Sequence, residues 1–325
     1  METLYPMLLE PVYKDYIWGG QRIPRRYGRD LPQGIYAESW EVADRPEGMS
    51  RVTNGPLAKH TLHDLVAEHG AALLGSAEPA ASVFPLLVKI IDAAKRLSVQ
   101  VHPNDFTAPA TGGDPKTECW YVLDAEPGAR VFAGLTPGTD ADAFRAALRT
   151  ERVEECLVSV PIEPGTVIFI PGGRVHAIDA GALLLEVQQN SNTTYRAYDW
   201  GRVGHDGKPR PLHIEEAMQV IDWNDHDSPR VEPVRIEASD ALERWELVRS
   251  PYFRIDRLDL HGTARFESDG SGFQILFTAD SNVRIQTGAT EMDLGPGTSC
   301  LLPAALRLYA LAPVTGTASV VRITP

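Results

Sequence analysis

Short apolar runs that end at Gly, Pro, Asn or Asp recur along most of this chain, and they restrict the folds that it can adopt. The 27 Gly and 25 Pro among 325 residues supply the turns between these runs. Three helix-like stretches, at 60–74, 140–157 and 212–223, do not alternate regularly with them. The strand-like runs lie at 85–91, 97–102, 118–123, 129–132, 166–170 and 182–188. The pattern predicts a mainly β fold, a sandwich or small barrel, with a small helical portion.

A break late in the chain predicts two domains. The polar stretch 224–233, which contains two prolines, precedes a final segment that is almost wholly strand-like. Residues 296–303 repeat the Pro-Gly-Thr turn and apolar strand of residues 164–171. Five residues after the closing proline, the first copy has His176 and the second has Leu308. We therefore expect a site-bearing domain at 1–235 and a second, metal-free domain at 236–325 whose core is apolar.

Charge and cysteine content limit the partners and the compartment. The 31 Lys and Arg residues and 44 Asp and Glu residues leave a net charge of −13. Nucleic acid and anionic membranes are therefore not expected as partners, because Lys and Arg dominate phosphate binding. No basic segment followed by a long apolar core opens the chain, so we expect a cytoplasmic protein. The odd set Cys119, Cys156 and Cys300 predicts free, buried thiols, and nothing in the sequence indicates the oligomeric state.

Four polar residues from three strand-like runs have the chemistry of a metal site. Strand alternation sends Gln100 and His102 to one face of their run, while the valines between and before them face the other side. Glu118 opens a later run, and His176 follows a Pro-Gly-Gly turn. Either histidine alone is more often a hydrogen-bonded core residue, but the full set can surround a divalent ion inside a barrel. These oxygen and nitrogen donors suit zinc, and also manganese, iron or cobalt.

The polar stretch 188–199, with Arg196 among aromatic neighbours, resembles the type I mannose-6-phosphate isomerases, a zinc-dependent branch of the cupin superfamily. The resemblance is strongest to their short bacterial form. Further motifs of that family occur in the same order along the chain, at 16–20, 37–41, 98–105, 116–118 and 171–176. Several separate motifs in one order make this a specific match.

The resemblance implies both a site and a reaction. The family's ligands for one zinc ion fall on Gln100, His102, Glu118 and His176, and its active-site arginine and lysine fall on Arg196 and Lys116. It also implies two cupin-like (jelly-roll) β-barrel domains, a metal-bearing one with a small helical portion followed by a metal-free one. The implied reaction is the reversible isomerisation of mannose 6-phosphate and fructose 6-phosphate through a cis-enediol. Arg196 suits an enediolate or a phosphate oxygen, Lys116 suits proton transfer, and the proton-transfer base stays open.

Other candidate substrate contacts, and the competing functions, are less constrained. Trp18 and Trp40 could cover the C–H surface of a sugar or could simply be buried. Lys89 and Arg202 could hold the phosphate or could form structural ion pairs. The alternatives to this isomerase are another metal-dependent cupin enzyme such as an iron dioxygenase, an isomerase of another sugar, and a non-catalytic sugar-binding cupin. A dioxygenase needs no phosphate-binding cations, and a binding protein would leave the metal set unused.

Overall fold

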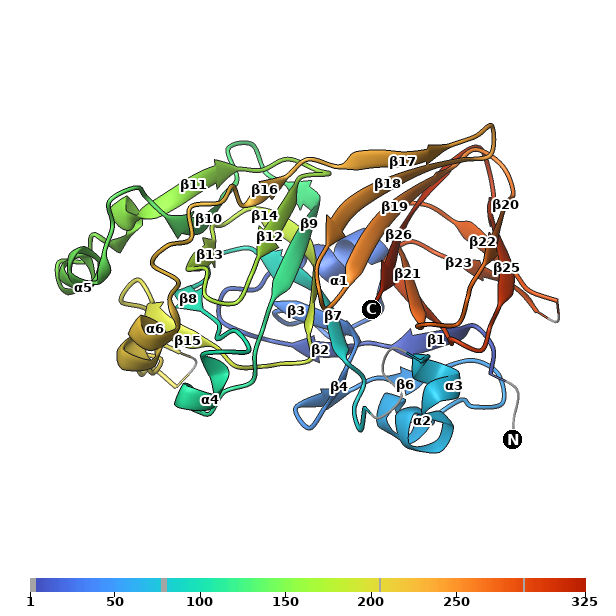
Figure 1. The fold of residues 1–325 in the computed structure, drawn as a ribbon, viewed down its shortest axis with the longest axis horizontal. Helices are drawn as coiled ribbons and strands as arrows, with labels where there is room; N and C mark the ends of the chain where they lie inside the picture. Colours follow the sequence, from blue (N-terminus) through green and yellow to red (C-terminus); the bar gives the residue numbers. More distant parts are fainter. Residues whose placement is uncertain (1–3, 77–80, 205, 289) are drawn as a thin grey trace. The chain divides into compact units, whose positions relative to one another are not determined.

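The computed structural model describes residues 4–76, 81–204, 206–288 and 290–325, and the chain divides into two compact units (Figure 1). The central unit comprises Tyr13–Ser39 and Lys89–Val231, and the terminal unit comprises Met1–Val12, Trp40–Val88 and Glu232–Pro325. Strands are the main regular structure of both units and far outnumber helices, which confirms the mainly β prediction. A unit boundary lies close to the predicted position 235/236. The division into domains 1–235 and 236–325 stays a prediction, because each compact unit also draws on earlier stretches of the chain.

Two sheets enclose the core of the central unit. Apolar side chains of both sheets, among them Trp120, Val131 and Ile168, form one buried cluster. The five-stranded sheet has the order β11 (Leu157–Pro161), β10 (Arg130–Leu135), β13 (His176–Ile178), β8 (Val99–Val101) and β15 (Tyr195–Tyr198). The seven-stranded sheet has the order β16 (Arg230–Val231), β12 (Val167–Ile170), β9 (Glu118–Ala125), β14 (Ala182–Gln189), β7 (Leu86–Ala93), β3 (Glu38–Val42) and β2 (Val12–Lys14). This arrangement is the predicted sandwich.

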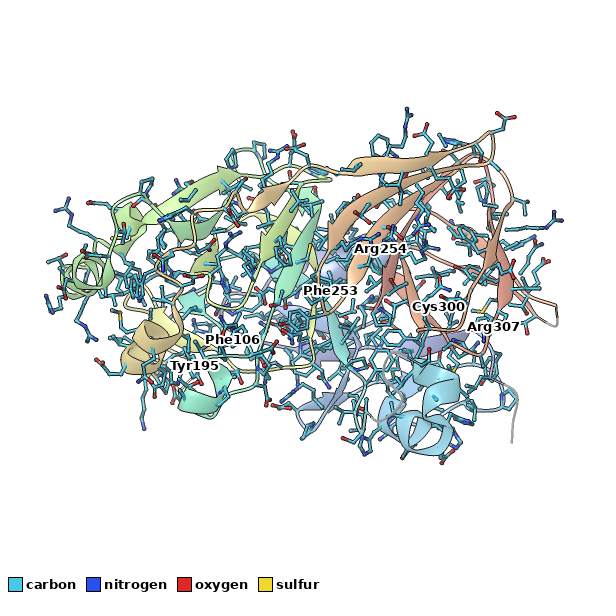
Figure 2. All side chains as sticks on the ribbon, viewed as in Figure 1. Phe106, Tyr195, Phe253, Arg254, Cys300 and Arg307 are labelled. Atoms are coloured by element: carbon cyan, nitrogen blue, oxygen red, sulfur yellow. The ribbon has the colours of Figure 1, made fainter. Side chains whose placement is uncertain are left out.

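Helices cover the other face of the five-stranded sheet. Val99 and Val101 of β8 pack into a second buried cluster with Phe144 and Val220 from two helices. Gln100 between the two valines therefore faces the opposite side, toward the space between the sheets. The helices of this unit are α1 (Arg22–Tyr27), α4 (Ala108–Thr111), α5 (Ala141–Arg149) and α6 (Ile214–Val220), with a 3-10 turn at Val153–Cys156. Figure 2 shows Phe106 on the exposed loop before α4, and Tyr195 at the start of β15.

The helix predicted over 140–157 is shorter than expected. Asp140 caps α5 by accepting a hydrogen bond from the Ala143 amide at 2.8 Å, as an N-cap residue should. The helix ends at Arg149, and Glu151 then adopts a φ of 58°. A left-handed residue cannot continue a right-handed helix, so the rest of the apolar pattern belongs to the 3-10 turn and to β11.

The terminal unit also contains two main sheets and one small helical segment. Thr61 and Asp64 form a reciprocal capping box at the start of α2 (Leu62–His69), and Gly70, with a φ of 43°, separates α2 from α3 (Ala71–Leu74). The larger sheet has the order β17 (Val234–Ala238), β18 (Leu242–Arg249), β19 (Arg254–Leu260), β26 (Ala318–Thr324), β21 (Gln274–Thr278), β24 (Thr298–Leu302), β1 (Met7–Glu10) and β6 (Arg51–Val52). The smaller sheet has the order β20 (Ala264–Glu267), β25 (Leu308–Pro313), β22 (Val283–Gln286) and β23 (Glu291–Leu294), and β4 (Asp44–Arg45) pairs with β5 (Gly48–Met49).

The expectation that Leu308 extends an apolar core is wrong. Its side chain is 63% exposed, and the next residue, Tyr309, points inward instead. The Tyr309 hydroxyl donates to Gln274 Oε1 at 2.6 Å, and a buried Arg322–Asp256 ion pair at 2.8 Å adds further polar groups inside the unit. The inward-facing positions of this strand begin one residue later than the sequence repeat suggested. This shift explains why Tyr309, and not Leu308, is buried.

Cys119, Cys156 and Cys300 are all unpaired and buried, as expected, and Figure 2 places Cys300 among the strands of the terminal unit. Within the described ranges, no helix has the length and apolar character needed to cross a membrane.

A ring of four charges at the edge of the five-stranded sheet gives a testable stability prediction. Arg96 and Arg130 both bind Asp179, at 2.8 and 2.9 Å, and both bind Glu154. Burial opposes ionisation, but the hydrogen bonds from the two arginines lower the pKa of Asp179 to about 2. A lowered pKa stabilises the fold above the unfolded value near 4, and that stabilisation disappears as the pH falls toward 2.

We expect Asp179→Asn to lower the free energy of unfolding at pH 7 by about 1–2 kcal/mol, after allowance for solvent screening. The variant should also lose part of the wild-type dependence of stability on pH between about 2 and 4. Chemical denaturation at a series of pH values measures both effects. Glu155→Gln, which removes an exposed pairing with Arg152, is the matched control and should change stability by under about 0.5 kcal/mol. Equal losses in the two variants would contradict the prediction.

Candidate active site

Three strands of the central unit bring the predicted metal ligands together. Gln100 lies in the middle of β8, and His176, the first residue of β13, is its direct cross-strand partner. His102 immediately follows β8, and Glu118 is the first residue of β9. His102, Glu118 and His176 are almost completely buried, and each offers one donor atom to a set that spans no more than 4.8 Å.

Backbone carbonyls determine which nitrogen each histidine presents to this set. His102 Nδ1 lies 2.8 Å from the Thr193 carbonyl, and His176 Nδ1 lies 2.9 Å from the Arg174 carbonyl. A carbonyl only accepts hydrogen bonds, so each Nδ1 carries the proton and each Nε2 keeps its lone pair. The two Nε2 atoms lie 3.5 and 3.4 Å from the carboxylate oxygens of Glu118.

The charge states agree with this geometry. Burial, followed by the nearby Lys116 ammonium, lowers the pKa of His102 to about 3, and burial also lowers the pKa of His176. Burial opposes ionisation of Glu118, but Lys116 and His102 outweigh it and hold the pKa of that carboxyl well below its usual range. The set therefore consists of two neutral imidazoles and one carboxylate, the protonation state that binds a metal ion.

The two Nε2 atoms have nitrogen neighbours in Lys116 and Gln100, but the buried carboxylate of Glu118 makes the site suitable for a further cation. Within the described part of the chain, neither oxygen of Glu118 accepts a hydrogen bond. The cation in contact with the carboxylate is Lys116, whose Nζ lies 2.7 Å from Glu118 Oε2 and 3.1 Å from His102 Nε2. Converging lone pairs in a buried space repel one another unless a positive charge lies among them. The donor set fits a divalent metal such as zinc.

Gln100 lies beside the three-residue set, and its amide nitrogen faces His176. Gln100 Nε2 lies 3.2 Å from His176 Nε2, and the Ser98 hydroxyl donates to Gln100 Oε1 at 3.3 Å. A metal ion bound to His176 would occupy the lone pair that this amide nitrogen now faces. Gln100 could serve as the fourth ligand only after a half-turn of its amide, which would present Oε1.

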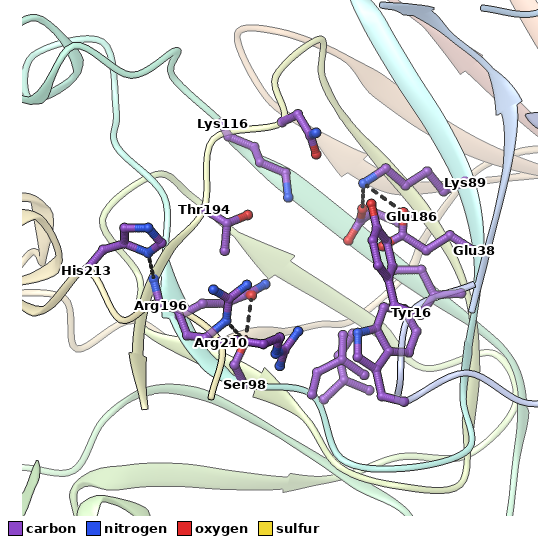
Figure 3. A pocket seen from close by; sticks show the side chains of 16 residues that line it. Tyr16, Glu38, Lys89, Ser98, Lys116, Glu186, Thr194, Arg196, Arg210 and His213 are labelled. Atoms are coloured by element: carbon purple, nitrogen blue, oxygen red, sulfur yellow. Dashed lines mark hydrogen bonds and ion pairs between the residues drawn. The ribbon is translucent and has the colours of Figure 1, made fainter. Parts of the chain in front are cut away.

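A cavity of about 300 Å³, entirely within the central unit, lies against these residues (Figure 3). Among the predicted site residues, Gln100, Lys116, Arg196, Trp18 and Lys89 line it, and Arg202 does not. Trp40 lies outside the lining and is fully buried in a small core cluster of the terminal unit. The remaining lining residues were not predicted from the sequence: Tyr16, Glu38, Ile91, Leu97, Ser98, Ile178, Glu186, Asn192, Thr194, Arg210 and His213.

Lys89 is placed at the cavity but is held by carboxylates. Its Nζ lies 3.1 Å from Glu186 Oε1 and 3.7 Å from Glu38 Oε2 (Figure 3). Burial lowers the pKa of Lys89, but the two carboxylates outweigh burial and the net direction is upward. Two negative charges around one ammonium leave no surplus positive charge here. Lys89 is therefore poorly suited to binding a phosphate dianion.

The surroundings of Arg196 are positive, unlike those of Lys89. Its Nε lies 3.3 Å from the Ser98 hydroxyl and its Nη1 donates to the Pro211 carbonyl at 2.9 Å, with no carboxylate within ion-pair distance among the described residues. Burial lowers the pKa of Arg196, and the nearby Arg210 lowers it further. Figure 3 shows Arg196, Arg210 and His213 gathered on one side of the cavity, away from Lys89 and Glu38. This side can accept an anion.

Comparison with known proteins gives consistent matches over nearly the whole chain. Residues 7–137 match the family model for the catalytic domain of type I phosphomannose isomerase, and residues 244–325 match the model for the cupin domain of mannose-6-phosphate isomerase. The chain is 35% identical over 311 residues to a mannose-6-phosphate isomerase of Bacillus subtilis, covering 95% of this chain and 96% of that protein. The corresponding protein of Streptococcus mutans is 33% identical over 305 residues, covering 94% of each.

Solved structures agree with these sequence matches. A crystal structure of the mannose 6-phosphate isomerase from Bacillus subtilis gives a TM-score of 0.89 at 31% identity, covering 98% of this chain and 99% of that chain. A phosphomannose isomerase structure from Salmonella typhimurium gives a TM-score of 0.76 at 18% identity and so shares the fold.

Proposed function

This chain belongs to the type I phosphomannose isomerase family, and from that premise we propose that it interconverts mannose 6-phosphate and fructose 6-phosphate. The resemblance drawn from the sequence motifs is thereby confirmed, as is the cupin fold expected for the C-terminal segment. One observation carries the proposal. Gln100 and Lys116, which contact the buried His102, Glu118 and His176 set, line the same cavity as Arg196, which has no carboxylate within ion-pair distance among the described residues.

The reaction needs a base, an acid and stabilisation of an enediolate. A proton leaves C2 of the open-chain aldose and returns at C1, while the carbonyl moves from C1 to C2. A carbon acid of this kind does not ionise unaided in water. The cavity must therefore stabilise negative charge on the two sugar oxygens as the proton moves.

We propose that Lys116 and Arg196 are the catalytic residues. Lys116 lines the cavity and contacts both Glu118 and His102, so its ammonium lies where protons could be exchanged with substrate oxygens next to the donor set. Arg196 is oriented by Ser98 and the Pro211 carbonyl, and its remaining nitrogen is available to hydrogen-bond an anionic substrate oxygen. Trp18 lines the same cavity and can cover the C–H face of a sugar.

We propose zinc as the metal, with His102, Glu118 and His176 as ligands and Gln100 as a fourth ligand after its amide turns. When bound, a divalent ion supplies Lewis-acid stabilisation of negative charge on nearby oxygens, an effect worth several kcal/mol. The hydrogen bonds from His102 and His176 to backbone carbonyls keep the proton of each ring on Nδ1, so that both Nε2 lone pairs are available to a metal ion.

Metal removal tests this function. We expect purified protein to form fructose 6-phosphate from mannose 6-phosphate, and removal of its metal by a chelator to lower turnover by about 100-fold or more. Addition of zinc should restore turnover. A zinc-loaded sample that forms no fructose 6-phosphate would contradict the proposal. Oxygen uptake by an iron-loaded sample would instead support a dioxygenase, and sugar binding without turnover would support a binding protein.

A further inference from the structure

Two arginines of the central unit, Arg202 and Arg210, bind a single buried carboxylate, and a third, Arg196, lies near enough to feel its charge. Asp199, directly after β15, is 5% exposed. Arg210 holds it with two nitrogens, Nε donating to Oδ2 at 2.8 Å and Nη2 donating to Oδ1, and Arg202 Nη2 also donates to Oδ1. Burial raises the pKa of Asp199, but these hydrogen bonds outweigh it and the net direction is downward, so Asp199 is ionised. With Arg196 close by, three cations meet one anion.

Two of these arginines present unused donors to the cavity. Arg210 uses Nε and Nη2 on Asp199, and Arg196 uses Nε on Ser98 and Nη1 on the Pro211 carbonyl. Both residues line the cavity, and in the described part of the chain Nη1 of Arg210 and Nη2 of Arg196 make no hydrogen bond. Like charges held together in this way favour a ligand that carries two negative charges.

The backbone of the loop holds Arg210 in this position. The His213 amide donates to the Arg196 carbonyl at 2.8 Å, and the Arg196 side chain binds the Pro211 carbonyl. Residues 211 and 213, which follow Arg210 in the chain, thus attach the segment that carries Arg210 to β15. The bidentate contact with Asp199 then orients the guanidinium, because this fork has one favourable orientation on a carboxylate.

Arg202 shares one contact with Arg210, the Nη2 bond to Asp199 Oδ1, but its other two nitrogens bind backbone carbonyls. Its Nη2 donates to Asp199 Oδ1, its Nε donates to the Asp199 carbonyl at 3.2 Å, and its Nη1 donates to the Arg96 carbonyl. Arg202 does not line the cavity. It adds positive charge nearby, but each of its three nitrogens already donates to the protein.

We propose that Arg210, oriented by Asp199, is the residue by which this enzyme selects a phosphorylated sugar over the unphosphorylated one. Arg210 binds the phosphate directly, and Asp199 is a positioning residue that aims its free edge into the cavity. The inference rests on the proposed function, since it names the group that recognises the substrate of that reaction.

Steady-state kinetics with mannose 6-phosphate and with mannose test this assignment. We expect Arg210→Ala to raise KM for mannose 6-phosphate by about 10- to 100-fold, the range for a lost hydrogen bond to a charged group. We expect kcat to stay within about fivefold of the wild-type value, and the preference for mannose 6-phosphate over mannose to fall by the same factor as KM rises. Arg210→Lys should give an intermediate KM, because it keeps the charge and loses the fork.

The other variants separate direct contact from general charge. Arg202→Ala removes the same charge and should raise KM at least about fivefold less than Arg210→Ala. Asp199→Asn keeps all three cations and should still raise KM about 10-fold, with kcat little changed, because it frees the Arg210 guanidinium. Arg145→Ala, which breaks an exposed bidentate pair with Glu215 outside the cavity, is the matched control and should leave both constants unchanged. Equal KM effects of the Arg202 and Arg210 variants would overturn the inference.

A binding measurement tests the role of Arg210 independently of whether the protein has the proposed isomerase activity. Mannitol 6-phosphate has no carbonyl group and cannot be isomerised, so calorimetry measures its Kd without turnover. We expect Kd to rise with Arg210→Ala by the same factor as KM. An unchanged Kd would overturn the assignment of Arg210, whereas absence of wild-type turnover with normal Kd changes would overturn only the isomerase activity. Melting temperatures close to that of the wild type establish that the variants are folded. If Asp199→Asn does not fold, Arg210→Lys tests the role of the oriented guanidinium in its place.

Discussion

Glu118→Gln should abolish metal binding and lower kcat/KM for mannose 6-phosphate by about 10³-fold or more. The substitution keeps the size of the side chain and removes the single negative charge of the donor set. Two neutral imidazoles and an amide bind a divalent ion much more weakly than a set that includes a carboxylate. It also leaves Lys116, which is almost fully buried, without its carboxylate partner at 2.7 Å. Metal analysis by mass spectrometry and steady-state kinetics measure the two effects.

Glu38→Gln is the matched control for that variant. Glu38 is also a buried carboxylate at the same cavity, but its partner is Lys89, and it takes no part in the donor set. The control should therefore keep its full metal content, whatever its turnover. Loss of metal from both variants would show that any buried carboxylate of the cavity supports binding, and would remove Glu118 from its role as a ligand.

Arg196→Ala should lower kcat by about 10²- to 10³-fold while the metal content stays at the wild-type value. Among the described residues, the Arg196 side chain forms no hydrogen bond or ion pair with His102, Glu118 or His176, and its partners are the Ser98 hydroxyl and the Pro211 carbonyl. Its removal therefore takes a cation from the cavity without changing the metal ligands. Turnover and bound metal, measured on the same preparation, give the result.

Arg196→Lys distinguishes charge from geometry in this prediction. A lysine keeps the positive charge but cannot donate from a planar fork, so we expect it to restore only part of the lost turnover. If metal content and turnover fell together in Arg196→Ala, the residue would have a structural role and its assignment as a catalytic residue would be wrong.

The sequence predicted much of the architecture because the signals concerned were local. Short apolar runs between turn residues predicted the strands that became β8, β9, β12 and β14. Alternation correctly placed Gln100 on the face opposite Val99 and Val101. The same local reasoning failed at Leu308, where a shift of one residue in the strand reverses inside and outside.

The cation assignments could not be predicted in this way, because they depend on which partners fold against each side chain. Lys89 and Arg202 were predicted either to hold the phosphate or to form structural ion pairs. Glu186 and Glu38 surround Lys89, and all three guanidinium nitrogens of Arg202 donate to Asp199 or to the Arg96 carbonyl. Arg210 carries no motif and was missed. Only the return of its loop to β15 brings it to the cavity.

The sequence by itself determined the strands, the turn positions and the types of donor atom, since these follow from side-chain chemistry and the period of the backbone. Tertiary structure alone decided that His102 and His176 present Nε2, because distant carbonyls bind their Nδ1 atoms. It also decided which arginines stay available. An ion pair forms with whatever carboxylate lies within about 4 Å, and that distance is set by the packing of segments far apart in the chain.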